Sequence, residues 1–110
     1  MPSIITRIIN RELPAKVFLE TDDVIVIQDI RPKAPVHLLL IPKQETPDFY
    51  STPDDILTML NRTAREVADR LGIADHFRIV INNGYGQEVP HLHYHFLSDL
   101  GAERLRFEEQ

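Results

Sequence analysis

The chain has 110 residues, of which 43% are hydrophobic, and it carries a formal net charge of −5. That charge, with no basic run along the chain, argues against non-specific nucleic acid binding, and no apolar run reaches the length of a membrane span. The chain has no cysteine, and its start has no cationic segment followed by an apolar one, so we expect a cytoplasmic protein without disulfides, folded as one domain over residues 1–110.

The first residues predict a short helix. Four isoleucines at positions 4, 5, 8 and 9 would share one apolar face of this helix, because residues three and four apart lie on the same side. Ser3 is suited to cap its first turn. The residue before a proline avoids helical geometry, so the helix should end near Leu13.

Three strands should follow this helix. Residues 17–20 and 24–28 are rich in β-branched side chains, and a short polar turn between them predicts a hairpin. A proline-stiffened connection, residues 31–35, leads to the apolar run 37–41. This run predicts a buried central strand that Pro42 closes.

A second, longer helix should begin after residue 52. Thr52 can cap it, Pro53 suits its first position, and two aspartates face its positive end. An apolar stripe continues to Leu71, and Gly72 supplies the stop. Residues 77–82 predict a further strand. We therefore predict an α+β fold, with a five-stranded antiparallel sheet and one long and one short helix on one side of it.

Three of the five histidines, His91, His93 and His95, stand at alternate positions near the end of the chain, and apolar residues lie between them. This period of two predicts a β-strand with an imidazole face and an apolar face. An imidazole titrates near neutrality and can act as base, acid, nucleophile or metal ligand. We interpret the row as an active site.

Metal binding is the main alternative for the histidine row. Zinc requires nitrogen ligands at about 2.0–2.1 Å. Two neighbouring imidazoles could converge on one ion, but a strand rises about 3.3 Å per residue, which places His91 and His95 about 13 Å apart. His37 is then the favoured additional ligand. We nevertheless expect no metal and no cofactor.

Two separate segments together resemble the histidine triad (HIT) family of nucleotide hydrolases and transferases. The first is residues 27–30 with Pro32, residues 34–37 and residues 41–43, and the second is residues 86–97, which contain the histidine row. The resemblance covers about residues 4–98 and is greatest to the small purine nucleoside phosphoramidases, the Hint-like branch. It implies a HIT-like fold.

The resemblance also implies a reaction. Purine nucleoside 5′-phosphoramidates would be hydrolysed through a covalent nucleotidyl-histidine intermediate, with His93 as the nucleophile. His95 and His37 would contact the phosphate or relay protons, and His91 would bind and orient, partly through its backbone. The alternatives are hydrolysis of dinucleoside polyphosphates, metal binding, and nucleotide binding without catalysis.

The nucleotide itself should be held by residues outside the histidine row. The resemblance assigns the ribose hydroxyls to Asp29, and a carboxylate is a good acceptor for a diol. The residues expected to contact the nucleotide are Asp29, Asn82, Gln87, Glu88, Val89, Ile8, Ile27 and Ile30. Asn82 would approach the sugar or phosphate, Gln87 would donate to the phosphate or leaving group, and the isoleucines would enclose the base.

The resemblance further implies a homodimer. A small domain gains buried core by pairing with a second copy. The long helix and the strand 77–82 are the candidate interface, the strand joining two sheets into one. We expect no nucleic acid and no membrane among the partners.

Overall fold

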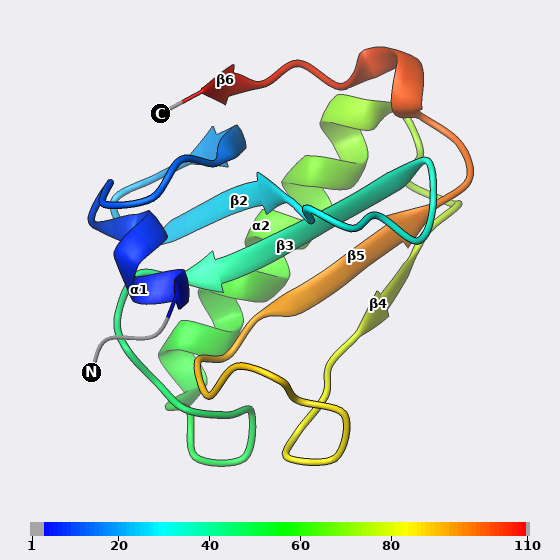
Figure 1. Cartoon of the computed structure of the whole chain (residues 1–110). Coiled ribbons are helices and arrows are strands. Elements are labelled where there is room, and N and C mark those ends of the chain that lie inside the picture. Colours follow the sequence, from blue (N-terminus) through cyan, green and yellow to red (C-terminus); the bar gives the residue numbers. More distant parts are fainter. Residues whose placement is uncertain (1–3, 110) are drawn as a thin grey trace.

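A computed structural model describes residues 4–109 of the chain. Its elements are α1 (Ile4–Ile9), β1 (Lys16–Glu20), β2 (Val24–Gln28), β3 (Val36–Pro42), α2 (Asp54–Leu71), β4 (Arg78–Val80), β5 (Tyr94–Ser98), a 3-10 turn η1 (Ala102–Arg104) and β6 (Glu108–Glu109). The sheet has the order β4-β5-β3-β2-β1-β6 (Figure 1). The predicted five-stranded antiparallel sheet is confirmed, and the two-residue β6 is added beside β1.

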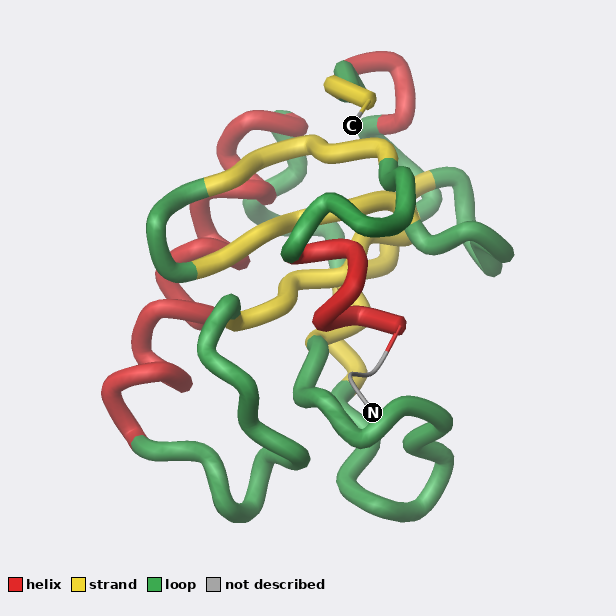
Figure 2. Tube along the Cα trace, turned by 60° about the vertical axis from the view of Figure 1, so that its left-hand side comes forward, coloured by secondary structure: helices red, strands yellow, loops and turns green. Residues whose placement is uncertain are grey.

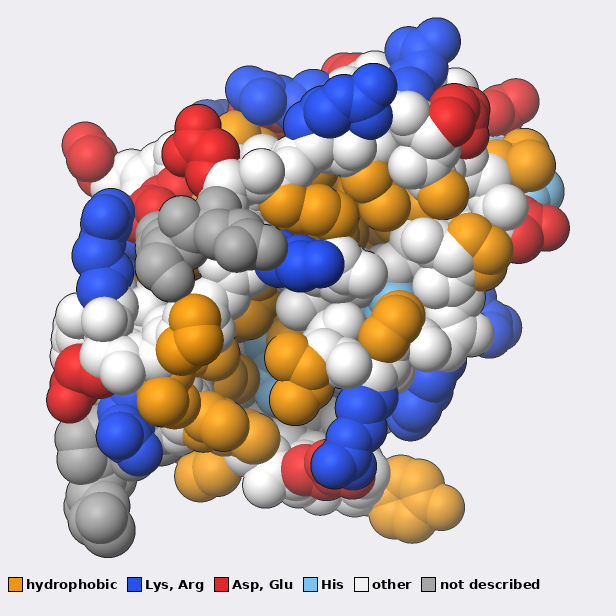
Figure 3. All heavy atoms as spheres, turned by 45° about the horizontal axis from the view of Figure 1, so that its top comes forward, with side chains coloured by type: hydrophobic (Ala, Val, Ile, Leu, Met, Phe, Trp, Pro, Cys, Tyr) orange, Lys and Arg blue, Asp and Glu red, His pale blue; other side chains and the backbone are white. Residues whose placement is uncertain are grey.

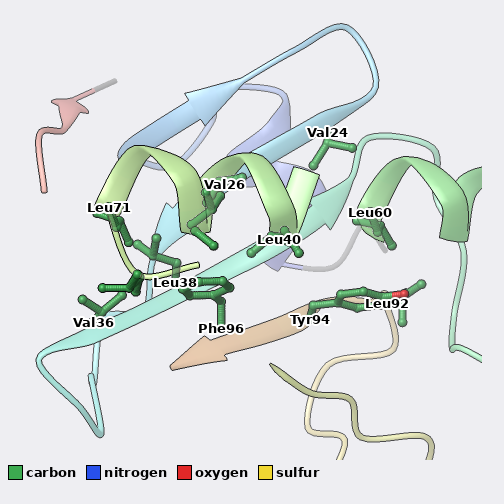
Figure 4. Close-up of a cluster of buried hydrophobic side chains, with 14 of the residues drawn as sticks. Val24, Val26, Val36, Leu38, Leu40, Leu60, Leu71, Leu92, Tyr94 and Phe96 are labelled. Carbon is green, nitrogen blue, oxygen red and sulfur yellow. The ribbon is translucent and has the colours of Figure 1, made fainter. Parts of the chain in front are cut away.

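The two helices pack on opposite faces of the sheet, which corrects the prediction that both lie on one side (Figure 2). The α2 face buries Val24, Val26, Leu38 and Leu40 against the helix, as Figure 4 shows. The α1 face buries Ile25, Ile27 and Ile41 with Ile5 of the short helix. The sheet is therefore a middle layer, and the two core clusters are separated by it.

The ends of the helices differ from the predicted ends. The α1 helix ends at Ile9 rather than near Leu13, and Arg11 follows in a left-handed conformation with φ 63°. The Ser3 cap lies outside the described residues. Pro53, not Thr52, occupies the N-cap position of α2. The Thr52 hydroxyl instead donates to the carbonyl oxygen of Asp48.

The predicted end of α2 is confirmed at Gly72. This glycine adopts φ 69°, and its N–H donates to carbonyl oxygens of the last helical turn, as a left-handed cap requires. No helix among residues 4–109 is long and apolar enough to cross a membrane.

The strand predicted over 77–82 is shorter, with only Arg78–Val80 in the sheet. It forms one edge, next to β5. Its residues are exposed, including the apolar Ile79 and Val80. The central strand β3 pairs with β2 on one side and with β5 on the other. Because β5 also pairs with β4, it is an inner strand of the sheet.

Candidate active site

The histidine row lies at the start of β5 but is not wholly inside the strand. The strand begins at Tyr94, so only His95 belongs to it. From Leu92 to Ser98 buried and partly exposed residues alternate, which confirms the predicted two faces for His93 and His95. His91 breaks the pattern because its side chain is completely buried.

The His91 imidazole is bound inside the protein. Its Nε2 lies 3.0 Å from the carbonyl oxygen of Pro42, the last residue of β3. A carbonyl can only accept, so the ring proton is on Nε2. Its Nδ1 lies 3.4 Å from the Thr6 hydroxyl of α1. Burial lowers the pKa of His91, which keeps the ring neutral, and its side chain therefore acts in the fold and not at an exposed surface.

We predict that His91→Ala lowers the free energy of unfolding by about 2–4 kcal/mol, since it leaves a cavity and removes the donor from a buried carbonyl. Urea denaturation would measure this change. Glu88→Ala is the matched control, because Glu88 is exposed in the same loop. A loss no larger than that of the control would contradict the buried role.

His93 is held in one tautomer by its neighbour. Its Nδ1 lies 2.8 Å from the carbonyl oxygen of His91, so Nδ1 carries the proton and donates it. The lone pair of the neutral ring is then on Nε2. A nitrogen nucleophile needs this arrangement. The backbone of His91, and not its imidazole, therefore orients His93.

His37 and His95 continue the row. The backbone N–H of Lys33 donates to His37 Nδ1 at 3.1 Å, which leaves the His37 proton on Nε2. His37 Nε2 lies 2.9 Å from His95 Nδ1, so His95 carries its proton on Nε2. The ring centroids are 5.2 Å apart for His37 and His95 and 5.0 Å apart for His93 and His95. The imidazoles of His93, His95 and His37 thus form one continuous row in the structure, and the buried His91 is not part of it.

The electrostatics at His37 and His95 favour neutral rings. Burial, with smaller contributions from His93 and His37, lowers the pKa of His95 to about 4. Burial also lowers the pKa of His37, against the opposing effect of Asp29. At neutral pH both rings are uncharged, which agrees with their single-proton hydrogen-bonding pattern.

These shifts predict a pH dependence of stability. A free histidine has a pKa near 6.5, so between about pH 4 and 6.5 the unfolded chain binds more protons at position 95 than the folded chain does. Stability should then rise with pH across this window and level off above it. Urea midpoints at pH 4.5 and 7.5 would measure the rise. His95→Gln should reduce it, and equal midpoints in the parent protein would contradict the depressed pKa.

Asp29 lies beside the row, just after β2. Its Oδ1 accepts the backbone N–H of Arg31 at 2.8 Å, and its Oδ2 lies 3.4 Å from His37 Nε2. A pocket of about 390 Å³ opens next to it. The pocket is lined by Asp29, Ile8, Ile27, Ile30, Pro14, Ala15, Lys16, Gln28 and Pro32. Figure 3 shows hydrophobic side chains gathered around a hollow with a histidine visible inside it.

The pocket thus joins Asp29 with the three isoleucines predicted to contact the nucleotide. The other four predicted contacts lie in the segment between β4 and β5. Gln87 is engaged there: its amide nitrogen lies 2.6 Å from the carbonyl oxygen of Pro47 and 3.1 Å from that of Val89. This differs from the expected phosphate contact, because both amide protons are directed at loop carbonyls.

The remaining predicted contacts are placed differently from one another. Glu88 is exposed. Val89 packs against the α1-face core. The Asn82 side chain lies near Gly86. Sequence reasoning missed the backbone donors of Arg31 and Lys33, since every residue except proline has such a group and no side-chain pattern reveals it.

The residues that could share a metal ion differ from those of the metal-binding alternative, which were the histidine row with His37. Asp29, His37 and His95 each offer a ligand atom within 4.8 Å of the others, whereas His91 and His93 use ring nitrogens on backbone carbonyls. Tetrahedral zinc with bonds of about 2.0–2.1 Å needs ligand atoms about 3.3 Å apart. The 2.9 Å contact between His37 and His95 is shorter. Zinc would have to replace the shared proton and part the two rings slightly.

Comparison with known proteins identifies the family. The model of the HIT domain matches residues 10–100. The chain belongs to the HIT domain family. It is 49% identical over 100 residues to a HIT-like protein of Synechocystis, with 86% of this chain and 88% of that protein covered. It is 43% identical to the adenylylsulfatase HINT1 of Arabidopsis thaliana, with 87% and 70% covered.

The solved structures agree with the sequence relatives. The structure of a HIT family hydrolase from Clostridium thermocellum matches with a TM-score of 0.83 and 41% identity, covering 87% of this chain and 89% of that one. In this HIT protein the histidine row, Asp29 and the pocket occupy adjoining positions on one side of the sheet.

Proposed function

We propose that this HIT protein hydrolyses purine nucleoside 5′-phosphoramidates through a nucleotidyl-histidine intermediate at His93. The observation that carries the proposal is the hydrogen bond from His93 Nδ1 to the carbonyl oxygen of His91 at 2.8 Å. When the ring is neutral, this hydrogen bond leaves the Nε2 lone pair available beside His95. Family membership and the hydrolase among the structural relatives support the same reaction class.

The proposed reaction has two displacements at phosphorus. His93 Nε2 forms a bond to phosphorus while the bond to the amine breaks, and the amine leaves with a proton taken from water. Water then attacks phosphorus, the bond to His93 breaks and the nucleoside monophosphate is released. The proton that the attacking water loses neutralises the hydroxide left when the amine was protonated. His95 would donate from Nε2 to a phosphoryl oxygen, and His37 would hold His95 in the tautomer that can donate.

The nucleoside is proposed to occupy the pocket next to Asp29. The carboxylate would accept from the ribose hydroxyls, and Ile8, Ile27 and Ile30 would enclose the base. Asn82, Glu88 and Val89 remain proposed nucleotide contacts, with Asn82 near the sugar or phosphate. Gln87 could serve the phosphate only by giving up one of its two carbonyl partners.

A substrate panel tests the proposed function. Adenosine and guanosine phosphoramidates, dinucleoside polyphosphates and nucleotide sugars would be offered to the purified protein, and product release followed by chromatography. Fastest turnover of the phosphoramidates is expected. Preference for dinucleoside polyphosphates would replace the proposed substrate with the other HIT reaction. Binding of AMP without turnover of any compound would show a non-catalytic nucleotide-binding protein.

We also propose that the protein is a homodimer. The exposed edge strand β4 presents Ile79 and Val80, each 37% exposed, and Met59 of α2 is 36% exposed. Pairing of two β4 edges would join the sheets and cover these side chains. Light scattering at micromolar concentration should give twice the chain mass. A monomer mass at that concentration would reject the dimer.

Zinc binding is the second candidate function. The approach of Asp29, His37 and His95 to within 4.8 Å favours it. Protein purified without nickel would be analysed for metal, and its activity measured with and without a chelator. Activity that disappears with chelator and returns with zinc would favour the metal and reject the nucleophile.

A further inference from the structure

Two loops lie side by side at the end of the sheet where β5 begins (Figure 1). One loop, residues 43–53, joins β3 to α2, and the other, residues 81–93, joins β4 to β5 and carries the first two histidines of the sequence motif. The loops are hydrogen-bonded to each other, for example from the Gln87 amide nitrogen to the carbonyl oxygen of Pro47 at 2.6 Å. The first loop therefore supports the second.

One contact between the loops reaches the peptide group that orients His93. The carbonyl oxygen of His91 accepts from His93 Nδ1 at 2.8 Å, and the N–H of Leu92 donates to the carbonyl oxygen of Thr46 at 2.8 Å. This carbonyl and this N–H belong to one planar peptide group, the 91–92 peptide, and point in opposite directions. The contact with Thr46 therefore restricts the direction in which the acceptor of His93 points. It also strengthens that acceptor, because hydrogen bonds in a chain polarise one another.

Thr46 is itself held by a pair of buried hydroxyl groups. Its Oγ1 lies 2.6 Å from Thr52 Oγ1, and the two residues are only 4% and 6% exposed. Thr52 donates its single hydroxyl proton to the carbonyl oxygen of Asp48, so the Thr46 hydroxyl is the donor within the pair. Thr52 stands next to Pro53, the N-cap residue of α2. The hydroxyl pair thus ties Thr46 to the start of the long helix.

The hydroxyl pair supplies direction as well as contact. Two apolar side chains of the same size would fill the same space, but apolar contact is non-directional. A hydrogen bond restricts both the distance and the angle between its groups. The pair between Thr46 and Thr52 therefore helps to set the orientation of the loop backbone, including the Thr46 carbonyl that meets the 91–92 peptide.

We propose that Thr46 is a positioning residue for His93. Its buried hydroxyl holds the loop so that its carbonyl oxygen orients the 91–92 peptide, which keeps the His93 proton on Nδ1 and leaves the Nε2 lone pair available for attack. The proposal rests on the nucleophilic role proposed for His93. Because alignment of the nucleophile acts on the chemical step, loss of the hydroxyl should lower kcat by about three- to tenfold. KM should change little, since the proposed nucleotide contacts around Asp29 remain.

The kinetic test uses three isosteric or conservative variants. Thr46→Val keeps the shape of the side chain without its hydroxyl, and Thr52→Val breaks the same pair from the other side. Both should lower kcat for adenosine 5′-phosphoramidate by about three- to tenfold, and Thr46→Ser, which retains the hydroxyl, should restore most of it. Thr63→Val is the matched control, because Thr63 is also buried and its hydroxyl donates to the carbonyl oxygen of Met59 within α2. A loss in the control equal to that in Thr46→Val would reject the positioning role.

The tautomer of His93 gives a readout that needs no turnover. A protonated ring nitrogen and one with a free lone pair differ clearly in 15N chemical shift, and NMR spectra would be recorded at about pH 8 so that the imidazoles are neutral. Thr46→Val should lower the ratio of Nδ1-protonated to Nε2-protonated His93 by about three- to tenfold and speed hydrogen exchange of the Leu92 amide. Thr63→Val should change neither.

The spectra separate this proposal from the proposed function. An unchanged His93 tautomer in Thr46→Val would reject the positioning role, whatever happens to kcat. If the parent protein hydrolyses none of the offered nucleotides, the proposed function fails. The tautomer ratio and the exchange of the Leu92 amide then still decide whether Thr46 orients His93, since both are measured without substrate.

Discussion

Replacing His93 by alanine should lower kcat for adenosine 5′-phosphoramidate by about a thousandfold or more, because only direct attack by water remains. The affinity for AMP should change by less than about fivefold, since the proposed ribose and base contacts at Asp29 and the isoleucine pocket stay in place. The carbonyl oxygen of His91 loses its donor in this variant, but the position is partly exposed and water can replace it. Discontinuous assays would measure the change in kcat, and calorimetry would measure the change in affinity for AMP.

His76→Ala is the matched control for this variant. His76 is exposed and its Nε2 lies 2.7 Å from Asp99 Oδ1, at a place that contributes nothing to the proposed site. Its loss should leave kcat unchanged. In the parent protein, a basic quench during turnover should trap one nucleotidyl group on His93, because a phosphorus–nitrogen bond is labile in acid. Full activity of His93→Ala would reject the nucleophile.

The strand face of the site could be predicted because its cause is local. Alternation over Leu92–Ser98 fits only a strand with one side against the core, and a shift by one residue would bury His93 and His95. His91 departs from this because distant groups act on it. Its N–H donates to the carbonyl oxygen of Val89, and its ring meets the carbonyl of Pro42. The spacing of the histidines does not reveal that the carbonyl oxygen of Pro42 needs a hydrogen-bond donor.

The apolar character of β2 and β3 on both sides indicates that α1 covers a second face of the sheet. All of the first four residues of β2 are buried, and β3 is buried at six of its seven positions. A strand that is apolar on both sides must be covered on both faces. The apolar run in residues 24–28 therefore indicates a helix on each face of the sheet. The end of α1 is harder to predict. Arg11 adopts a left-handed conformation in the turn that follows, and arginine has no preference for that conformation.

The chemistry of the row depends on backbone groups more than on side chains. The carbonyl of His91 sets the tautomer of His93, and the N–H of Lys33 sets that of His37 and, through it, of His95. The sequence names the imidazoles but not the atoms that bear their protons. Those assignments follow only when residues 58 positions apart, such as His37 and His95, are brought into contact.

Replacing Asp29 by alanine should weaken AMP binding by about ten- to a hundredfold, the effect of a lost hydrogen bond to a charged group worth about 1.5–3 kcal/mol. The fold should survive, because the Arg31 N–H that Asp29 accepts is exposed and water can bind it. Asp29→Asn keeps the size and an acceptor but removes the charge, and should lie between the two. Asp22→Ala, in the exposed turn between β1 and β2, is the matched control for loss of a carboxylate.

A thermodynamic cycle with 2′,3′-dideoxy-AMP assigns this loss to the ribose. The parent protein should bind the analogue about ten- to a hundredfold more weakly than AMP, because the carboxylate then has no hydroxyl to accept from. Asp29→Ala should bind the two ligands with nearly equal affinity, since either change alone removes the same contact. If the parent protein binds both equally, Asp29 does not hold the ribose, and its closeness to His37 Nε2, at 3.4 Å, becomes its main role at the site.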